Sequence, residues 1–260
     1  MLGAIVGDIV GSAYEFNNFK SKDFQPLLHP KAKYTDDTVC TVAIADALVN
    51  DLSPVATLQD WCQRYWDNGG WGQRFNLWLG EADPQPYGSY GNGAAMRVGP
   101  AGLLATSLEV ALELAYKVTV VTHNHPEGIK AGQATAVAIW MARSGAGAGD
   151  IRKALTERFG YDLTITVDSI RPDYKFTEAC QDSVPQALVC ALEATDFEDA
   201  IRNAASIGGD SDTIAAIAGS VAEARFGIPE IIAAQAWVYL PQDMRAVMTA
   251  LYRAMPQTAS

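Results

Sequence analysis

The chain has 260 residues, of which 49% are hydrophobic and 19% are charged, a balance typical of globular rather than disordered proteins. The net charge of −11 argues against general nucleic-acid binding and against docking on anionic membranes, because both need a basic surface. The sequence has no apolar run of about 18 residues, and its first residues lack the basic segment of a signal peptide. We therefore expect a cytoplasmic protein that does not associate with membranes.

The first apolar segment carries three glycines at intervals of four residues, Gly3, Gly7 and Gly11. This spacing places them on one side of a helix, where another helix can approach closely. Glu15 follows at the end of the apolar run. Its carboxylate is interpretable either as a solvated helix end or as a ligand for a metal or a water molecule.

Apolar residues recur at helical spacing in several later segments, separated by glycine-rich loops. These segments are 38–49, 99–115, 128–142, 184–192, 197–205, 213–226 and 244–255. The best strand candidate, 163–167, stands alone and cannot form a sheet by itself. The pattern predicts an all-α fold in which residues 1–260 form a single, compact, alanine-rich domain.

Two of the predicted helices begin with the same chemistry. The sequences Thr-Asp-Asp-Thr at 35–38 and Gly-Gly-Asp-Ser-Asp-Thr at 208–213 each place two carboxylates within one helical turn. An N-cap needs only one side-chain oxygen, and two adjacent carboxylates repel each other unless a cation lies between them. An oxygen-only donor set favours Mg²⁺ or Mn²⁺ over zinc. The candidate ligands are Thr35, Asp36, Asp37, Asp210, Asp212 and Thr213.

A glycine-rich stretch between these motifs, 86–97, runs into a helical segment. Free backbone N–H groups in such a loop can hold a phosphate, although the stretch is neither a Walker loop nor a dinucleotide fingerprint. Four of the six tryptophans lie between Trp61 and Trp78. We expect most of them to fill the core, with stacking on a base or framing of an acceptor as the alternative.

The cysteines do not indicate a zinc site. They form no CxxC pair and the chain has only three histidines, so we expect buried, reduced thiols. They are Cys40, Cys62, Cys180 and Cys190.

Taken together, these motifs resemble the ADP-ribosylglycohydrolase family, whose order they follow from about residue 1 to 230. The resemblance is carried by Gly7-Asp8 with Glu15-Phe16, by the two acidic motifs, by 91–97 and by Thr122-His123. It implies an all-α fold around a binuclear Mg²⁺ or Mn²⁺ centre held by the six candidate ligands. It also implies an ADP-ribose contact along the loop and at the histidines, which gives the substrate-binding residues Gly91, Asn92, Gly93, Ala94, Met96, Arg97, His123 and His125.

The reaction that this resemblance implies is hydrolysis of the bond between C1″ of ADP-ribose and a modified acceptor, which we expect to be protein arginine. Two cations can grip vicinal ribose hydroxyls and orient a water molecule at the anomeric carbon. We expect Glu15 to shuttle the proton, with Asp36 as the other catalytic residue. One alternative is a hydrolase that acts on ADP-ribose linked to serine or nucleic acid, or on a small N-ribosyl nucleotide. The other is a non-catalytic member that binds ADP-ribose or has a structural role. The sequence does not indicate the oligomeric state.

Overall fold

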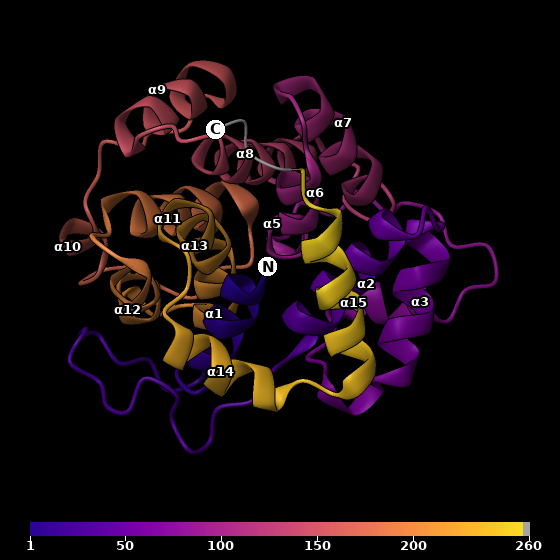
Figure 1. Ribbon diagram of the computed structural model, residues 1–260, viewed down its shortest axis with the longest axis horizontal. Coiled ribbons are helices and arrows are strands. Elements are labelled where there is room, and N and C mark those ends of the chain that lie inside the picture. The colour runs from indigo at the N-terminus through magenta and orange to yellow at the C-terminus, as the bar shows by residue number, and fades with distance from the viewer. Residues whose placement is uncertain (257–260) are drawn as a thin grey trace.

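The computed structural model describes residues 1–256, and these residues form helices joined by loops, without a β-strand (Figure 1). An isolated antiparallel bridge between Gly91 and Ala179 is the only β-type pairing within that range. The expected all-α fold is therefore confirmed.

The elements follow one another along the chain as a series of mostly short helices. They are α1 (Leu2–Ser12), α2 (Asp36–Val49), α3 (Pro54–Arg64), the 3₁₀ helix η1 (Trp66–Asn68), α4 (Gln73–Leu79), α5 (Gly93–Met96), α6 (Gly99–Leu104), α7 (Leu108–Thr119), α8 (Pro126–Arg143), α9 (Ala148–Phe159), α10 (Val167–Ile170), α11 (Cys180–Glu193), α12 (Phe197–Ile207), α13 (Ser211–Phe226), α14 (Glu230–Tyr239) and α15 (Gln242–Ala254).

The most extensive contact between two helices of residues 1–256 is that of α1 with α13, which lie left of the middle of Figure 1. The glycines of α1 face the backbone of α13, as their spacing predicted. A Cβ on Gly7 would lie 2.0 Å from the carbonyl oxygen of Ala215, and one on Gly11 would lie 2.3 Å from that of Ser211. Only glycine allows this approach, so the closeness of the two helices depends directly on the sequence.

This packing fixes the position of the C-terminal end of α1 relative to the N-terminal end of α13. The contact between Gly11 and Ser211 places the last turn of α1 beside the first turn of α13. The residues from Ser211 to Ala222 are buried, since α8, α11 and α12 also pack against α13. The start of α13 is therefore held rigidly within the core.

The segment between α1 and α2 has no regular secondary structure and loops outward at the lower left of Figure 1. It returns to the core at Thr35, whose hydroxyl oxygen accepts a hydrogen bond from the backbone N–H of Asp37 over 3.3 Å. This cap starts α2, which packs against α1, α3 and α15.

Two details of the predicted elements are wrong. The segment 99–115 is not one helix, because Ser107 adopts an extended conformation and its hydroxyl caps the start of α7 at the N–H of Val110. The segment 163–167 is not a strand, because Thr166 caps the short helix α10 through a capping box with Ser169. In both places a side-chain oxygen competes with the regular backbone pattern.

The four cysteines are buried and free, as expected, although Cys40 and Cys62 approach each other with 3.9 Å between their sulfur atoms. Among residues 1–256, no helix combines the length and apolar character needed to cross a membrane.

Candidate active site

The two acidic motifs meet in space. The hydroxyl of Thr213, in the first turn of α13, donates a hydrogen bond to Oδ2 of Asp37, in the first turn of α2, over 3.2 Å. These residues are 176 positions apart in the sequence. The two motifs therefore lie side by side, as one shared site requires.

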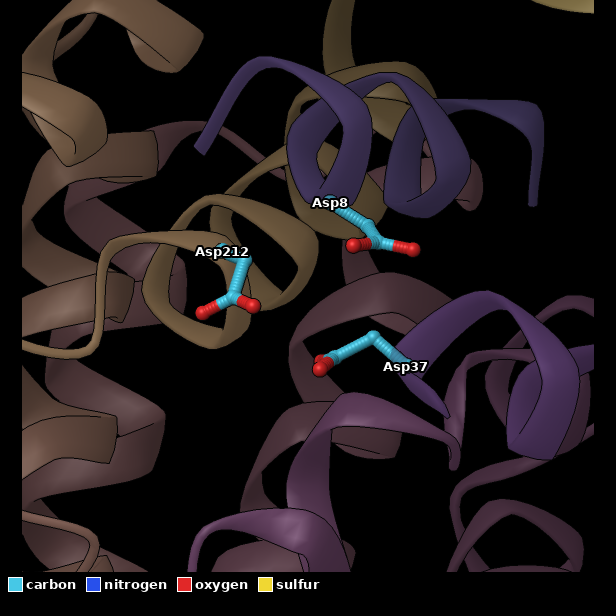
Figure 2. Close-up of side chains that lie close together, drawn as sticks. All are labelled: Asp8, Asp37 and Asp212. Carbon is cyan, nitrogen blue, oxygen red and sulfur yellow. The ribbon is translucent and has the colours of Figure 1, made fainter. Parts of the chain in front are cut away.

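Three carboxylates converge where α1, α2 and α13 meet, and Figure 2 shows them pointing toward one another. They belong to Asp8, Asp37 and Asp212, and one oxygen of each lies within 4.8 Å of the others. A second group consists of Glu15, Asp210 and Asp212, and one carboxylate oxygen of each likewise lies within 4.8 Å of the others. Asp212 is common to both groups, so the site consists of two adjoining acidic clusters.

Burial and mutual repulsion both act on these acids. Burial is the main cause that raises the pKa of Asp37 and of Asp212 well above the usual range, and the charges of neighbouring aspartates raise it further. The Oδ1 atom of Asp37 is buried and has no hydrogen-bond partner within residues 1–256. An unpaired carboxylate oxygen facing other carboxylates is costly in a protein interior unless a cation balances it.

These observations fit divalent metal ions. The groups facing one another supply only carboxylate and hydroxyl oxygens, which are the donors that Mg²⁺ and Mn²⁺ prefer. The carboxylates of Asp37 and Asp212 are in reach of a shared ion, and Asp210 with Glu15 extends the donor set on the other side.

The remaining predicted ligands lie around these clusters. The hydroxyl of Thr35 donates to Oδ1 of Asp8 over 2.8 Å, while Oδ1 of Asp36 accepts a hydrogen bond from the backbone N–H of Gly70 over 3.0 Å. Asp36 and Thr35 line the cleft described below. All six predicted ligands are therefore in or beside the site.

Asp8 is the important residue that the sequence analysis did not assign. It is fully buried in α1, and its carboxylate accepts hydrogen bonds from the N–H of Thr35 at 2.9 Å and the N–H of Thr38 at 3.1 Å. It also accepts hydrogen bonds from both threonine hydroxyls. Burial, partly offset by these donors, raises its pKa to about 6. A lone acid inside an apolar, glycine-rich helix was the signal that could have revealed it.

Glu15 lies just beyond the end of α1 and lines the cleft. Its pKa is raised to about 7, mainly by burial and then by the charge of Asp210. Asn18 holds this turn in place, because its Nδ2 donates to the carbonyl oxygen of Glu15 over 3.0 Å and its Oδ1 accepts the N–H of Gly209 over 2.9 Å. Asn18 thus ties Glu15 to the second acidic motif.

The acids open into a cleft of about 660 Å³. The predicted substrate residues that line it are Gly91, Asn92, Gly93, Met96, Arg97 and His123. Ala94 is buried behind this surface. His125 is exposed outside it, where its Nδ1 caps α8 by accepting the N–H of Glu127 over 3.1 Å.

The tryptophan-rich segment is divided between the core and the surface. Trp61 and Trp78 are buried at 2% and 1% exposure, as expected for core residues, whereas Trp66 is 43% exposed. None of the four lines the cleft, but Phe75 of the same segment does.

Comparison with known proteins gives a consistent result. Residues 1–258 match the protein family described as ADP-ribosylglycohydrolase. The chain is 25% identical to the ADP-ribosylarginine hydrolase Tri1 of Pseudomonas putida, over 99% of this chain and 78% of that protein. It is 24% identical to the mouse ADP-ribosylhydrolase ARH3, over 89% of this chain and 84% of that protein.

The fold also matches a solved structure described as an ADP-ribosylglycohydrolase-related protein complex. The TM-score is 0.71 at 25% sequence identity, over 97% of this chain and 96% of that one. The chain therefore belongs to the ADP-ribosylglycohydrolase family of hydrolytic enzymes.

Proposed function

We propose that this enzyme hydrolyses the bond between C1″ of ADP-ribose and the guanidinium nitrogen of a modified protein arginine, with two Mg²⁺ or Mn²⁺ ions as its cofactor. The observation that carries the proposal is the convergence of Asp37, Asp210, Asp212 and Glu15 at one cleft.

The side chains of the site suit a reaction that passes through a positively charged sugar. Carboxylates beside the anomeric carbon stabilise the developing oxocarbenium charge. Glu15 lies at the cleft beside these acids, and its carboxyl group can serve as the general acid or base. Asp36 belongs to the first acidic motif and also lines the cleft, so it is the second candidate for this role. When bound, the metal ions would supply Lewis-acid polarisation of the sugar oxygens.

Two observations favour arginine as the acceptor. A relative that aligns with 99% of this chain is named as an ADP-ribosylarginine hydrolase. In addition, Glu178 lines the cleft and forms no ion pair within residues 1–256. Burial, and then the charges of Asp210 and Asp36, raise the pKa of its carboxyl group. A guanidinium group near this carboxylate would find a charge of opposite sign.

The test is release of ADP-ribose from defined arginine-linked, serine-linked and nucleic-acid-linked substrates, with Mg²⁺, with Mn²⁺ and with a chelator. We expect metal-dependent release that is fastest from ADP-ribosyl-arginine. The Asp37→Asn variant should be inactive, whereas Asp60→Asn, which alters an exposed acid of a surface ion pair, should behave as the parent does. Faster release from another linkage would reassign the acceptor. Tight ADP-ribose binding without release from any substrate would indicate a non-catalytic member instead.

A further inference from the structure

Two phenylalanine rings are exposed at the mouth of the cleft. Phe16 is 89% exposed and Phe176 is 50% exposed, and both belong to the residues that line the cleft. A single apolar side chain on a protein surface is ordinary, but large apolar groups that gather at a binding cleft mark a contact surface. We call Phe16 and Phe176 together the aromatic rim.

The turn that carries Phe16 is anchored on both sides. Before it, Tyr14 is buried against the ring of Phe24, with 4.9 Å between the ring centroids. After it, the side-chain amide of Asn18 donates to the carbonyl oxygens of Tyr14 and Gly209 over 2.7 and 3.2 Å. The exposure of Phe16 is therefore imposed by a fixed turn of the backbone.

Phe176 lies between two anchored residues in the same way. Before it, the hydroxyl of Tyr174 donates to the carbonyl oxygen of Asp182 over 3.0 Å. After it, the carbonyl oxygen of Glu178 accepts the backbone N–H of Asn92 over 2.7 Å. The loop thus holds Phe176 at the cleft, although half of the side chain remains uncovered.

Lys20 joins the two loops that carry the rim. Its ammonium group donates to the carbonyl oxygens of Tyr174 and Ile207, over 2.6 Å in each case. Both loops also contact Gly209 of the second acidic motif. Asn18 accepts the N–H of Gly209 over 2.9 Å, and a Cβ on Gly209 would lie 2.6 Å from Cε1 of Tyr174. The aromatic rim is therefore fixed at the acidic end of the cleft.

This placement indicates which part of a substrate the rim meets. Phe16 directly follows Glu15, and Phe176 lies two residues before Glu178, which the proposed function places beside the acceptor. A substrate whose C1″ bond lies among the carboxylates must extend its acceptor outward past these residues. The rings carry no charge and no hydrogen-bonding group, so they suit apolar atoms of a polypeptide better than a sugar or a diphosphate.

From this arrangement we propose that the aromatic rim is a docking surface for the acceptor polypeptide, on which Phe16 and Phe176 contact apolar side chains that flank the modified residue. The rim would make the enzyme prefer a modified protein over the same linkage on a free amino acid. Aromatic side chains often dominate the affinity of such interfaces. The inference rests on the proposed function for the reaction, and goes beyond it because cleavage of the C1″ bond does not require these rings.

The first measurement compares two substrates with one linkage, a protein mono-ADP-ribosylated on arginine and free ADP-ribosyl-arginine. We expect Phe16→Ala and Phe176→Ala each to lower the ratio of their kcat/KM values, protein over free amino acid, by about 10-fold, mainly through KM for the protein. Burial of part of a phenyl ring against a partner strengthens binding by about that factor. An unchanged ratio in both variants would overturn the proposal.

Two further variants separate docking from other effects. Phe16→Leu keeps an apolar side chain but removes the flat ring, so it should keep most of the preference for the protein. Phe226→Ala removes a ring that is 39% exposed at the end of α13 and is not among the residues that line the cleft. That variant should keep the parent's ratio, and an equal loss there would overturn a specific role of the rim.

Calorimetric titration with ADP-ribose tests the other possible occupant of the rim. The affinity of Phe16→Ala and Phe176→Ala for ADP-ribose should equal that of the parent, because the rim meets the acceptor and not the nucleotide. A loss of about 10-fold would show that a ring stacks on adenine or contacts a ribose, and would overturn the docking role.

The failure of this proposal differs from the failure of the proposed function. If the parent cleaves ADP-ribosyl-arginine and the rim variants keep its ratio, the proposed function stands and the docking surface fails. If the parent cleaves no substrate but binds the modified protein more tightly than ADP-ribose, and Phe16→Ala loses that excess, the docking surface stands and the proposed function fails. If another linkage is released faster, the same comparison is made with that linkage.

Discussion

The side-chain amide of Asn92 donates a hydrogen bond to Oδ2 of Asp210 over 2.7 Å, within the buried part of the cleft wall. The backbone N–H of Asn92 also donates to the carbonyl oxygen of Glu178 over 2.7 Å. One residue therefore connects the glycine loop with the second acidic motif. The sequence suggested that Asn92 contacts the substrate, and the structure adds that its side chain holds a predicted metal ligand.

Replacement of Asn92 by alanine should weaken metal binding as well as ADP-ribose binding. Loss of a hydrogen bond to a charged group costs about 1.5–3 kcal/mol, which corresponds to about 10- to 100-fold in affinity. Calorimetric titration with Mn²⁺ measures the first effect, and titration with ADP-ribose measures the second.

The matched control is Asn50→Ala, because Asn50 makes the same kind of bond to Asp46 at 2.7 Å in an exposed position. That variant should keep both affinities. Unchanged Mn²⁺ affinity in Asn92→Ala would show that Asp210 does not need this bond to bind metal.

The crowded carboxylates also predict how stability depends on pH. In the metal-free protein, the pKa of Asp8 is raised from 3.8 to about 6 and that of Glu15 from 4.5 to about 7. At a pH between the unfolded and the folded pKa of each group, the folded state retains a proton that the unfolded state has released. The contribution of Asp8 and Glu15 to the free energy of unfolding therefore falls as pH rises from about 4 to about 7.

Divalent cations should reverse this trend, because they bind the ionised carboxylates. Thermal unfolding at pH 5, 6, 7 and 8, with chelator and with excess Mg²⁺, measures the gain in melting temperature due to metal. We expect the gain to increase with pH in the parent and to be nearly lost in Asp37→Asn. An equal gain at pH 5 and pH 8 would exclude carboxylates of raised pKa from the metal site.

The sequence predicted the two acidic motifs because their signal is local. Thr35 and Asp37 occupy one turn, and Asp210 and Asp212 occupy another. Residues that are close in the sequence were therefore enough to predict both motifs. That these turns face each other follows only from the packing of α1, α2 and α13. The resemblance to a family supplied that information before the structure did.

Asp8 shows what local patterns could not provide. Its hydrogen-bond partners Thr35 and Thr38 lie 27 and 30 residues away, beyond a loop without regular structure. The boundary at Ser107 was missed for a different reason. The apolar pattern continues through it, and only the capping hydrogen bond to Val110 divides the helix.

The glycines of α1 allow a direct test of the central packing. In Gly7→Ala the new Cβ would lie 2.0 Å from a backbone oxygen of α13, so the two helices would have to separate. Overpacking of a well-filled core typically costs about 1–3 kcal/mol, and a clash with backbone belongs at the upper end. Urea denaturation measures this loss.

The control is Gly149→Ala in the helix α9, where a Cβ would meet no atom of residues 1–256 within 4 Å outside its own turn of helix. Because alanine favours a helix more than glycine does, this variant should be as stable as the parent or slightly more stable. Equal stability of Gly7→Ala and Gly149→Ala would contradict the close contact between α1 and α13.

The replacement Glu15→Gln tests catalysis at a residue whose position the structure explains. Glutamine keeps the volume of the side chain, and Asn18 still holds the turn through the backbone carbonyl of residue 15. As a general acid or base, Glu15 should contribute about 10²–10⁴-fold to the rate, so kcat should fall by that factor. The affinity for ADP-ribose and the melting temperature should change little.

The control for removal of a carboxylate is Glu113→Gln, at an exposed position on α7. Turnover of ADP-ribosyl-arginine within a few-fold of the parent would exclude Glu15 as the proton donor, and Asp36 would then be the residue to replace next.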